Sequence, residues 1–266
     1  MILRRPAEPK TNPGRRIVLV GASNLVRNIA TVVQTACAAW GAPADLLMAA
    51  GHGRSYGLAS HVLGRTLPGI VECGLWQSLA QRHPAQTAAL VTDIGNDILY
   101  GADDGTIAAW VKCCLLQLRA VDARVIITEL PLRNLRNLET WRFRLFRTVL
   151  FPQSRLTLEV ALRRATALNE RIKELAVQHQ ATLVRPWENW YGFDPIHLRR
   201  KQQADAWSEV MSHWNPRPSA TGCPGTAWNA LYLRSLRPYR RRVVGVPLCR
   251  AQPCGQLADG TRISLY

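Results

Sequence analysis

Short apolar runs alternate with longer segments of helical spacing along most of the chain. Five runs of four to six residues are mainly apolar and end at glycine, proline or polar residues, which is typical of buried parallel strands; they cover 17–20, 45–50, 88–92, 124–128 and 181–184. Between them, apolar residues recur every three or four positions, which predicts helices; these cover 25–40, 106–120, 156–180 and 202–214. The alternation predicts a three-layer α/β/α sandwich with a mostly parallel five-stranded sheet.

Composition separates this region from the two ends of the chain. The 266 residues are 47% hydrophobic and carry a net charge of +16. Residues 1–16 hold five basic residues and one acid, and residues 215–266 hold eight arginines, six prolines and one acid. Proline-rich, charged stretches without periodicity rarely form a core. We therefore predict a basic extension over 1–16, a folded domain over 17–214 and a basic, disordered tail over 215–266.

Several classes of protein fit the sequence poorly. No apolar stretch reaches the roughly 20 residues of a membrane-spanning helix, and the N-terminus lacks the apolar core of a secretory signal. We therefore expect a cytoplasmic protein with reduced cysteines. The seven cysteines contain no C-x-x-C pair, which argues against a zinc ribbon or a dithiol redox site. The charge raises nucleic acid as a partner, but no base-reading motif accompanies it, so a nucleic-acid-binding protein is the weakest hypothesis.

Four predicted strand ends carry residues that suit chemistry. Ser23 follows the first strand, Gly51 the second and Asn96 the third, and Asp194 and His197 form a D-x-x-H pair after the last. Ligands bind beyond the carboxyl ends of parallel strands. Each residue also has an ordinary interpretation: Ser23 as a helix cap, Asn96 as a turn residue, His197 as a cap of the next helix. The segment 51–57 is G-x-G-x-x-x-G, one residue too long for a dinucleotide fingerprint.

Taken together, the four blocks resemble the SGNH hydrolases, the superfamily of the GDSL esterases and lipases, over residues 17–214. Gly95-Asn96-Asp97 resembles the family's G-x-N-D, and the last block is a full D-x-x-H. The opening block departs from G-D-S, because Ala22 stands in place of the aspartate and Asn24 follows the serine. The resemblance identifies a divergent member and implies the flavodoxin-like fold of that family.

The resemblance implies a serine esterase. Ser23 would be the nucleophile, His197 its base and Asp194 the residue that orients His197. The Ser23 and Gly51 N–H groups and the Asn96 amide would form the oxyanion hole. Neither a metal nor a cofactor is expected. The substrate would be a small-molecule or carbohydrate ester, and a carbohydrate O-deacetylase is one form of this function. An acyltransferase or a non-catalytic member with the same pocket is the alternative.

Substrate contacts are expected from the loops that follow the strands. Arg54 and Tyr56 follow Gly51, and Trp190 precedes the D-x-x-H pair together with Trp187 and Tyr191; the three aromatic residues would equally suit the core. In residues 133–147, five arginines alternate with apolar side chains. This pattern fits an amphipathic surface helix with extended arginines, and it also fits a lid that selects the substrate. The acyl group, the leaving alcohol and the oligomeric state do not follow from the sequence.

Overall fold

The computed structural model describes residues 14–62, 64–151, 154–215 and 227–266. Its main sheet has seven strands in the order β10-β11-β2-β1-β5-β6-β7. Their bounds are β1 Arg15–Val20, β2 Asp45–Ala49, β5 Gln86–Val91, β6 Arg124–Thr128, β7 Thr182–Val184, β10 Gly255–Gln256 and β11 Arg262–Leu265. All pairs are parallel except β10 with β11. The five predicted strands are present, and their order β2-β1-β5-β6-β7 is the flavodoxin-like order.

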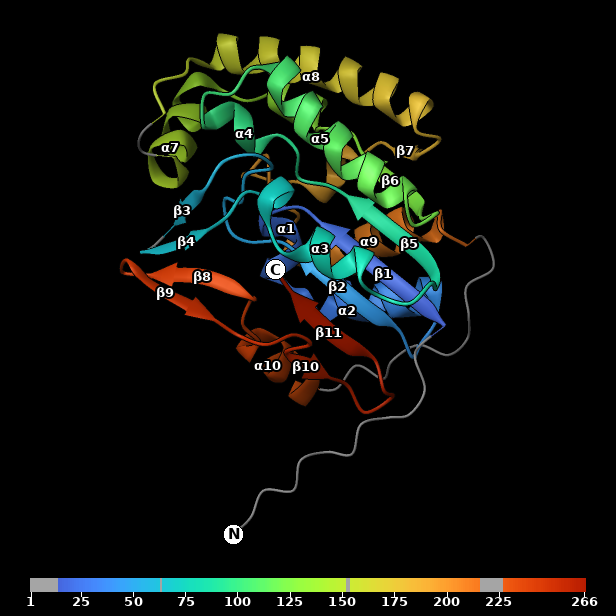
Figure 1. Ribbon diagram of the computed structural model, residues 1–266. Coiled ribbons are helices and arrows are strands. Elements are labelled where there is room, and N and C mark those ends of the chain that lie inside the picture. Colours follow the sequence, from blue (N-terminus) through green and yellow to red (C-terminus); the bar gives the residue numbers. More distant parts are fainter. Residues whose placement is uncertain (1–13, 63, 152–153, 216–226) are drawn as a thin grey trace.

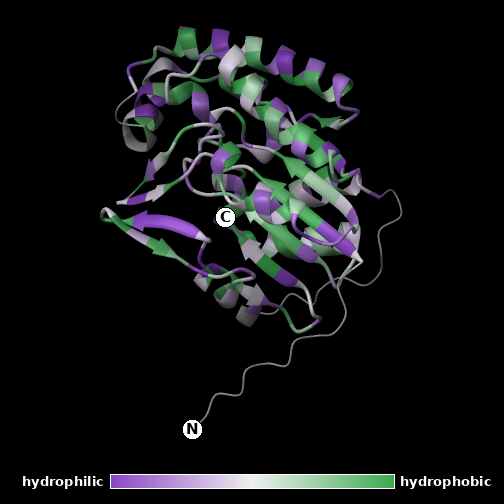
Figure 2. Ribbon diagram, viewed as in Figure 1, coloured by the Kyte–Doolittle hydropathy of each residue, from purple (hydrophilic) through white to green (hydrophobic). Residues whose placement is uncertain are grey.

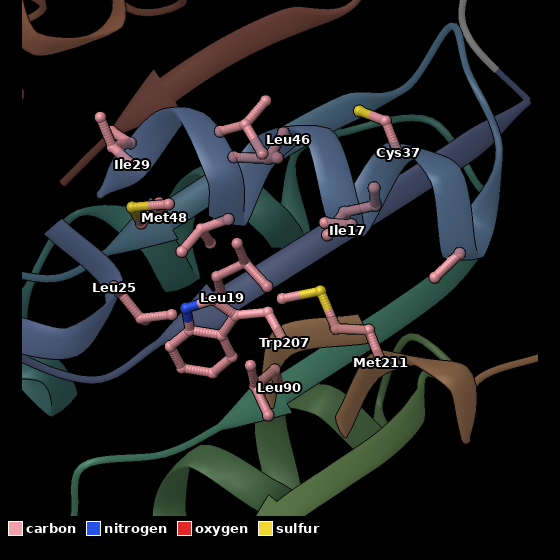
Figure 3. Close-up of a cluster of buried hydrophobic side chains, with 14 of the residues drawn as sticks. Ile17, Leu19, Leu25, Ile29, Cys37, Leu46, Met48, Leu90, Trp207 and Met211 are labelled. Atoms are coloured by element: carbon pink, nitrogen blue, oxygen red, sulfur yellow. The ribbon is translucent and has the colours of Figure 1, made fainter. Parts of the chain in front are cut away.

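Helices cover both faces of the main sheet, which confirms the three-layer prediction (Figure 1). One face carries α2 Ile29–Trp40, α9 Gln203–Ser212 and α10 Ala227–Ser235, and the other carries α3 Leu75–Ala80, α5 Asp104–Arg119 and α8 Leu158–Gln178. Strand residues alternate between the two cores, so Leu19 faces the first helix layer while Val18 and Val20 face the second. Figure 3 shows Trp207 of α9 in the first core, beside Leu19.

The predicted helix over 25–40 is divided in two. The first part, α1, covers Ser23–Arg27, and α2 begins at Ile29. Asn28 between them has φ −141° and ψ 61°, outside the helical region. Its side-chain amide donates to Thr31 Oγ1 at 2.6 Å. Asparagine favours such helix starts because its side chain bonds nearby groups in place of the helical backbone.

The tail expected to be disordered contains ordered elements. Its residues 227–266 form α10, β8 Arg240–Val243, β9 Val246–Cys249, β10 and β11. Strand β11 extends the main sheet beside β2, with Ile263 paired to Leu46 and fully buried, so the sheet has two strands more than expected. The expectation of disorder was wrong for these residues, because long-range pairing with β2 supplies a core that the local proline and arginine content hides. Residues 1–13 and 216–226, also assigned to the extension and the tail, lie outside the described residues.

A second, smaller sheet joins the tail to a loop near the site. Its strands run in the order β3-β4-β8-β9, where β3 is Ser60–Val62 and β4 is Arg65–Leu67, and all pairs are antiparallel. It lies to the left in Figure 1, and Figure 2 shows β8 as hydrophilic beside the mainly hydrophobic central strands. The remaining helical segments are η1 Ile70–Glu72, α4 Asn96–Leu99, α6 Leu132–Arg136, α7 Thr140–Leu150, η2 Glu188–Trp190 and η3 Arg200–Gln202. No helix in the described ranges is both long and apolar enough to cross a membrane.

Candidate active site

The turn after β1 holds Ser23 at the carboxyl edge of the sheet. Gly21 is required there by space, because a Cβ on it would lie 2.8 Å from Thr92 Cγ2 at the end of β5. The Gly21 N–H donates to Ala49 O at 3.1 Å, which joins the turn to the end of β2. Ser23 opens α1 and is 7% exposed. The neighbouring strand ends therefore fix this serine in place.

Ser23, His197 and Asp194 form one chain of hydrogen bonds. Ser23 Oγ lies 2.9 Å from His197 Nε2, and His197 Nδ1 lies 2.5 Å from Asp194 Oδ2. The other Asp194 oxygen accepts the backbone N–H groups of Ile196 and His197 at 3.1 and 3.2 Å. A carboxylate at Nδ1 fixes the imidazole tautomer so that Nε2 can accept the serine proton. The structure thus brings together the three residues that the sequence proposed as nucleophile, base and orienter.

The charge state of Asp194 suits that arrangement. Burial alone would raise the pKa of this carboxyl, but hydrogen bonds from the His197 ring and from two backbone N–H groups, with the charge of His197, hold the pKa below its ordinary value. Arg27 Nη1 lies 3.7 Å from the same carboxylate. Asp194 is therefore ionised at neutral pH and can stabilise a protonated His197.

Asp93 and Asn24 take a part in the site that the sequence did not reveal. Asp93 Oδ2 accepts the Ala22 and Asn24 N–H groups at 3.2 and 2.9 Å, and Oδ1 accepts the Asn24 amide at 2.7 Å. Asn24 also donates to Ile196 O and accepts from the Leu198 N–H, both at 2.9 Å. The two side chains therefore connect the serine turn to both sides of His197.

This pair also explains the departure from G-D-S. Ala22 has no side chain that could anchor the serine turn, and Asp93 supplies a carboxylate to it from the end of β5 instead. Its backbone adopts φ +57°, a conformation that aspartate and asparagine tolerate better than most residues. Burial raises the pKa of Asp93, and the hydrogen bonds from Asn24 oppose that rise. The only sequence signal was an aspartate at a strand end, which usually indicates a turn.

The three residues proposed for the oxyanion hole follow three adjacent strands. Asn96 opens α4, and both Asn96 and Ser23 line one cavity. Gly51 lines a second cavity, on the side of Val26 and Arg27. A Cβ on Gly51 would lie 2.6 Å from Leu67 Cδ1, so this loop packs closely against the Leu67 side chain. The role of all three as oxyanion donors stays a prediction.

The residues expected to contact substrate are structural instead. Arg54 is fully buried, and its guanidinium donates to the backbone oxygens of Ala50, Pro68 and Tyr266. Tyr56 is also fully buried and donates to Thr92 O at 2.7 Å. Trp190, at 5% exposed, belongs to the core between the sheet and α2. A position shortly after a strand end does not tell whether a side chain faces the ligand or the interior, and here all three face the interior.

Asp97 joins the loops after β2 and β5. It is fully buried, accepts the Ser55 hydroxyl, and accepts the Tyr56 N–H at 3.0 Å. Burial raises the pKa of Asp97 to about 6, although these hydrogen bonds oppose the rise. The aspartate of the G-x-N-D block therefore holds the Gly51 loop against the Asn96 loop.

An apolar cavity of about 120 Å³ begins at Ser23 and Asn96. Its walls include Leu130, Leu135, Leu138, Phe143, Phe146, Ala161, Leu162 and Tyr191. Several of these belong to the arginine-rich segment, whose helices α6 and α7 turn apolar side chains toward the cavity. Arg133 of this segment forms an exposed ion pair with Glu188. The segment is therefore an amphipathic cover that lines the cavity with its apolar side chains, and its role in selecting the substrate stays a prediction.

The cover contacts the loop that carries Asp194. Phe193 lies between Trp141 and Phe146 of α7, at ring-centre distances of 6.0 and 5.7 Å. Arg142 lies over the Phe193 ring at 4.4 Å and donates to its carbonyl oxygen. The position of α7 and the position of the acid loop are thus linked. In the parts of the chain that the structure describes, no group of three or more His, Cys, Asp or Glu side chains is placed to hold a metal ion.

Solved structures of similar fold were found, but no similar sequence. No protein-family model and no curated protein sequence matches the chain. A carbohydrate acetylesterase family member from Sinorhizobium meliloti is similar with a TM-score of 0.50 and 13% identity, over 74% of this chain and 96% of that one. Est24, a carbohydrate acetylesterase from the same organism, is similar with a TM-score of 0.51 and 12% identity, over 74% and 97%. These likenesses confirm the predicted fold.

Proposed function

We propose that the protein hydrolyses carboxylic esters through an acyl-enzyme on Ser23. The proposal is carried by one observation, the hydrogen-bonded chain from Ser23 through His197 to Asp194 at the mouth of an apolar cavity. A serine hydroxyl is a weak nucleophile by itself, and an imidazole within hydrogen-bond distance activates it. The same three groups would serve equally for transfer of the acyl group to an alcohol, so the choice of acceptor needs an experiment.

The reaction has two steps. Ser23 Oγ attacks the ester carbonyl while His197 Nε2 takes the serine proton and then gives it to the leaving alcohol. A water molecule next attacks the acyl-enzyme, His197 takes its proton, and the acid leaves as Ser23 is restored. The Ser23 and Gly51 N–H groups and the Asn96 amide would bind the oxyanion in both steps. Loss of one such donor typically costs about 3 kcal/mol of transition-state stabilisation.

The cavity indicates an aliphatic acyl group. Its walls are leucine, phenylalanine, alanine and isoleucine side chains for most of their area, and burying a methylene group contributes about 0.8 kcal/mol. An acetyl group would leave most of this surface uncovered. We therefore place a longer acyl chain in the cavity and the leaving alcohol on the side of Gly51. This differs from a deacetylase, the form of esterase that the sequence suggested.

The test is hydrolysis of p-nitrophenyl esters by wild type and Ser23→Ala. We expect Ser23→Ala to lower kcat by a factor of about 10³ or more, because the nucleophile is lost while binding remains. Ser212→Ala, at an exposed serine at the end of α9, is the matched control and should be as active as wild type. A fluorophosphonate probe should label wild type at Ser23. Equal rates for wild type and Ser23→Ala would refute the proposal, and labelling with turnover only in the presence of an added alcohol would indicate an acyltransferase.

A further inference from the structure

A second cavity, lined in part by Gly51 and Arg27, is strongly basic. It has a volume of about 460 Å³, and its charged and titratable lining residues are Arg27, Arg65, Arg200, Arg234, Arg237 and His52. None of the residues that line it is an aspartate or glutamate. They come from α1, β4, η3, α10, the segment after α10 and the loop after β2, so distant parts of the sequence converge here. Such a concentration of one sign of charge in a concave site attracts anions.

The basic cavity is next to the reacting groups. Arg27 lies in α1, four residues after Ser23, and its guanidinium is 3.7 Å from the Asp194 carboxylate. His52 directly follows Gly51, the proposed oxyanion residue, and Arg200 follows His197 by three residues. Burial lowers the pKa of His52, and the charges of Arg65, His197 and Arg27 lower it further. The cavity therefore begins where the leaving alcohol would be if the acyl chain occupies the apolar cavity.

The arginines of this cavity are poorly matched by acids. Arg27 forms an ion pair with Asp194. Within the described ranges, no ion pair to an acidic side chain is formed by the other four arginines, which are Arg65, Arg200, Arg234 and Arg237. Arg237 donates to the carbonyl oxygens of Arg234 and Leu236. Burial lowers the pKa of Arg65, and the charges of Arg241 and Arg237 add to that effect. Arg65 is partly buried, whereas Arg200, Arg234 and Arg237 are exposed and open to a ligand in the cavity. A cleft lined by one sign of charge raises the local concentration of a ligand of the opposite sign.

We propose that the leaving group of the substrate is a phosphorylated alcohol, and that the basic cavity binds its phosphate. This proposal rests on the proposed esterase function and specifies its substrate class. Guanidinium groups bind phosphate through paired N–H donors, and an alkyl phosphate carries up to two negative charges. The ester bond between acyl carbon and alcohol oxygen breaks, the acyl carbon bonds first to Ser23 Oγ and then to water oxygen, and the alcohol leaves with its phosphate intact.

Two substrates that differ by one phosphate test this directly: 2-hydroxyethyl hexanoate and its phosphate monoester. We expect wild type to hydrolyse the phosphate monoester with at least tenfold higher kcat/KM. The preference should fall as salt is raised, because the contact is electrostatic. In the double variant Arg65→Gln, Arg234→Gln, the ratio of the two kcat/KM values should approach one. The control Arg119→Gln removes an exposed arginine at the end of α5 and should keep the wild-type ratio.

The outcomes separate this inference from the proposed function. Equal kcat/KM for the two esters, together with Ser23-dependent cleavage of p-nitrophenyl esters, would overturn the inference alone. If no ester is cleaved, calorimetry with Ser23→Ala still decides: it should bind the phosphate monoester more tightly than the neutral ester. Binding to a membrane surface is a separate outcome. Wild type would then sediment with phosphatidylglycerol vesicles, the double variant would not, and the two soluble esters would be cleaved equally well. This result would overturn the inference.

Discussion

Replacing Asp93 by asparagine tests whether this carboxylate positions the nucleophile. Asparagine has the same size and tolerates the left-handed backbone at this position, so the substitution changes the hydrogen bonds and little else. The carboxylate accepts three hydrogen bonds, one from Ala22 and two from Asn24. An amide can keep the two backbone donors on its oxygen. Its NH₂ group then faces the Asn24 NH₂ group, so one bond is replaced by a contact between two donors.

The expected loss follows from the energy of that bond. A hydrogen bond to a charged group contributes about 1.5–3 kcal/mol. Asn24 cannot rotate its amide to restore the bond without losing its own bonds to Ile196 and Leu198 on the His197 loop. If the loss appears in the transition state, kcat/KM falls about ten- to a hundredfold, since about 1.4 kcal/mol corresponds to a factor of ten. The fall should be mainly in kcat, because the hydrogen bonds of Asp93 hold the serine turn and, through Asn24, the His197 loop.

The assay is steady-state hydrolysis of a p-nitrophenyl ester, with thermal unfolding measured in parallel. Asp259→Asn is the matched control, because Asp259 also accepts a backbone N–H and a side-chain donor, from Thr261, but in the loop before β11 at the opposite edge of the sheet. It should leave kcat unchanged. A kcat for Asp93→Asn within twofold of wild type would refute the positioning role. An equal loss of activity in Asp259→Asn would show that general destabilisation is the cause.

Three further predictions concern the cavity and the buried polar groups. Ala161→Phe should fill part of the apolar cavity and lower kcat/KM for p-nitrophenyl octanoate at least tenfold relative to the acetate; an unchanged ratio would place the acyl chain elsewhere. Because the pKa of Asp97 in the folded protein is about 6, above its ordinary value of 3.8, the folded state binds the proton more tightly, and the free energy of unfolding should fall by about 2 kcal/mol as pH rises from 4.5 to 7. Urea unfolding at pH 4.5 and 7 should show this fall in wild type and a smaller one in Asp97→Asn. An equal fall in both proteins would contradict the raised pKa of Asp97. Arg54→Met keeps the aliphatic stem but leaves the backbone oxygens of Ala50, Pro68 and Tyr266 without the guanidinium, so urea unfolding should show a loss of about 3 kcal/mol, and a loss under 1 kcal/mol would show that water replaces it.

The pattern of apolar residues along the chain predicted the strands and helices that bury an apolar face. The five buried strands and their covering helices have clear apolar patterns, and their alternation predicted the three-layer sandwich. The flavodoxin-like strand order was implied only by the resemblance to the SGNH hydrolases. The proposed nucleophile and base were found because parallel strands place their carboxyl ends at one edge. Which neighbours support them did not follow. Asp93 and Asn24 act through hydrogen bonds across 69 residues of sequence, and such partners have no periodic signal.

The hairpin of β8 and β9 shows why the tail was misjudged. Its two-residue turn is Val244-Gly245, with φ of +48° and +81°. Two-residue hairpins need positive φ at both positions and usually have asparagine or aspartate before glycine. A β-branched valine in this conformation is an outlier and gives no turn signal. The strand before it begins Arg240-Arg241-Arg242, which resembles a solvated charge run until its pairing with β4 is known.

The ordered structure of residues 227–266 changes the interpretation of the net positive charge. The sequence placed most of the positive charge in two ends outside a catalytic domain, and so separated charge from chemistry. Arg234 and Arg237 belong to that tail, yet α10 and the segment after it place them in one cavity with Gly51 and Arg27. The β8 strand pairs with β4, which carries Arg65 into the same cavity. Charges that are distant in sequence thus line one cavity with Gly51, because the residues after 226 complete both the sheet beside β2 and a wall of that cavity.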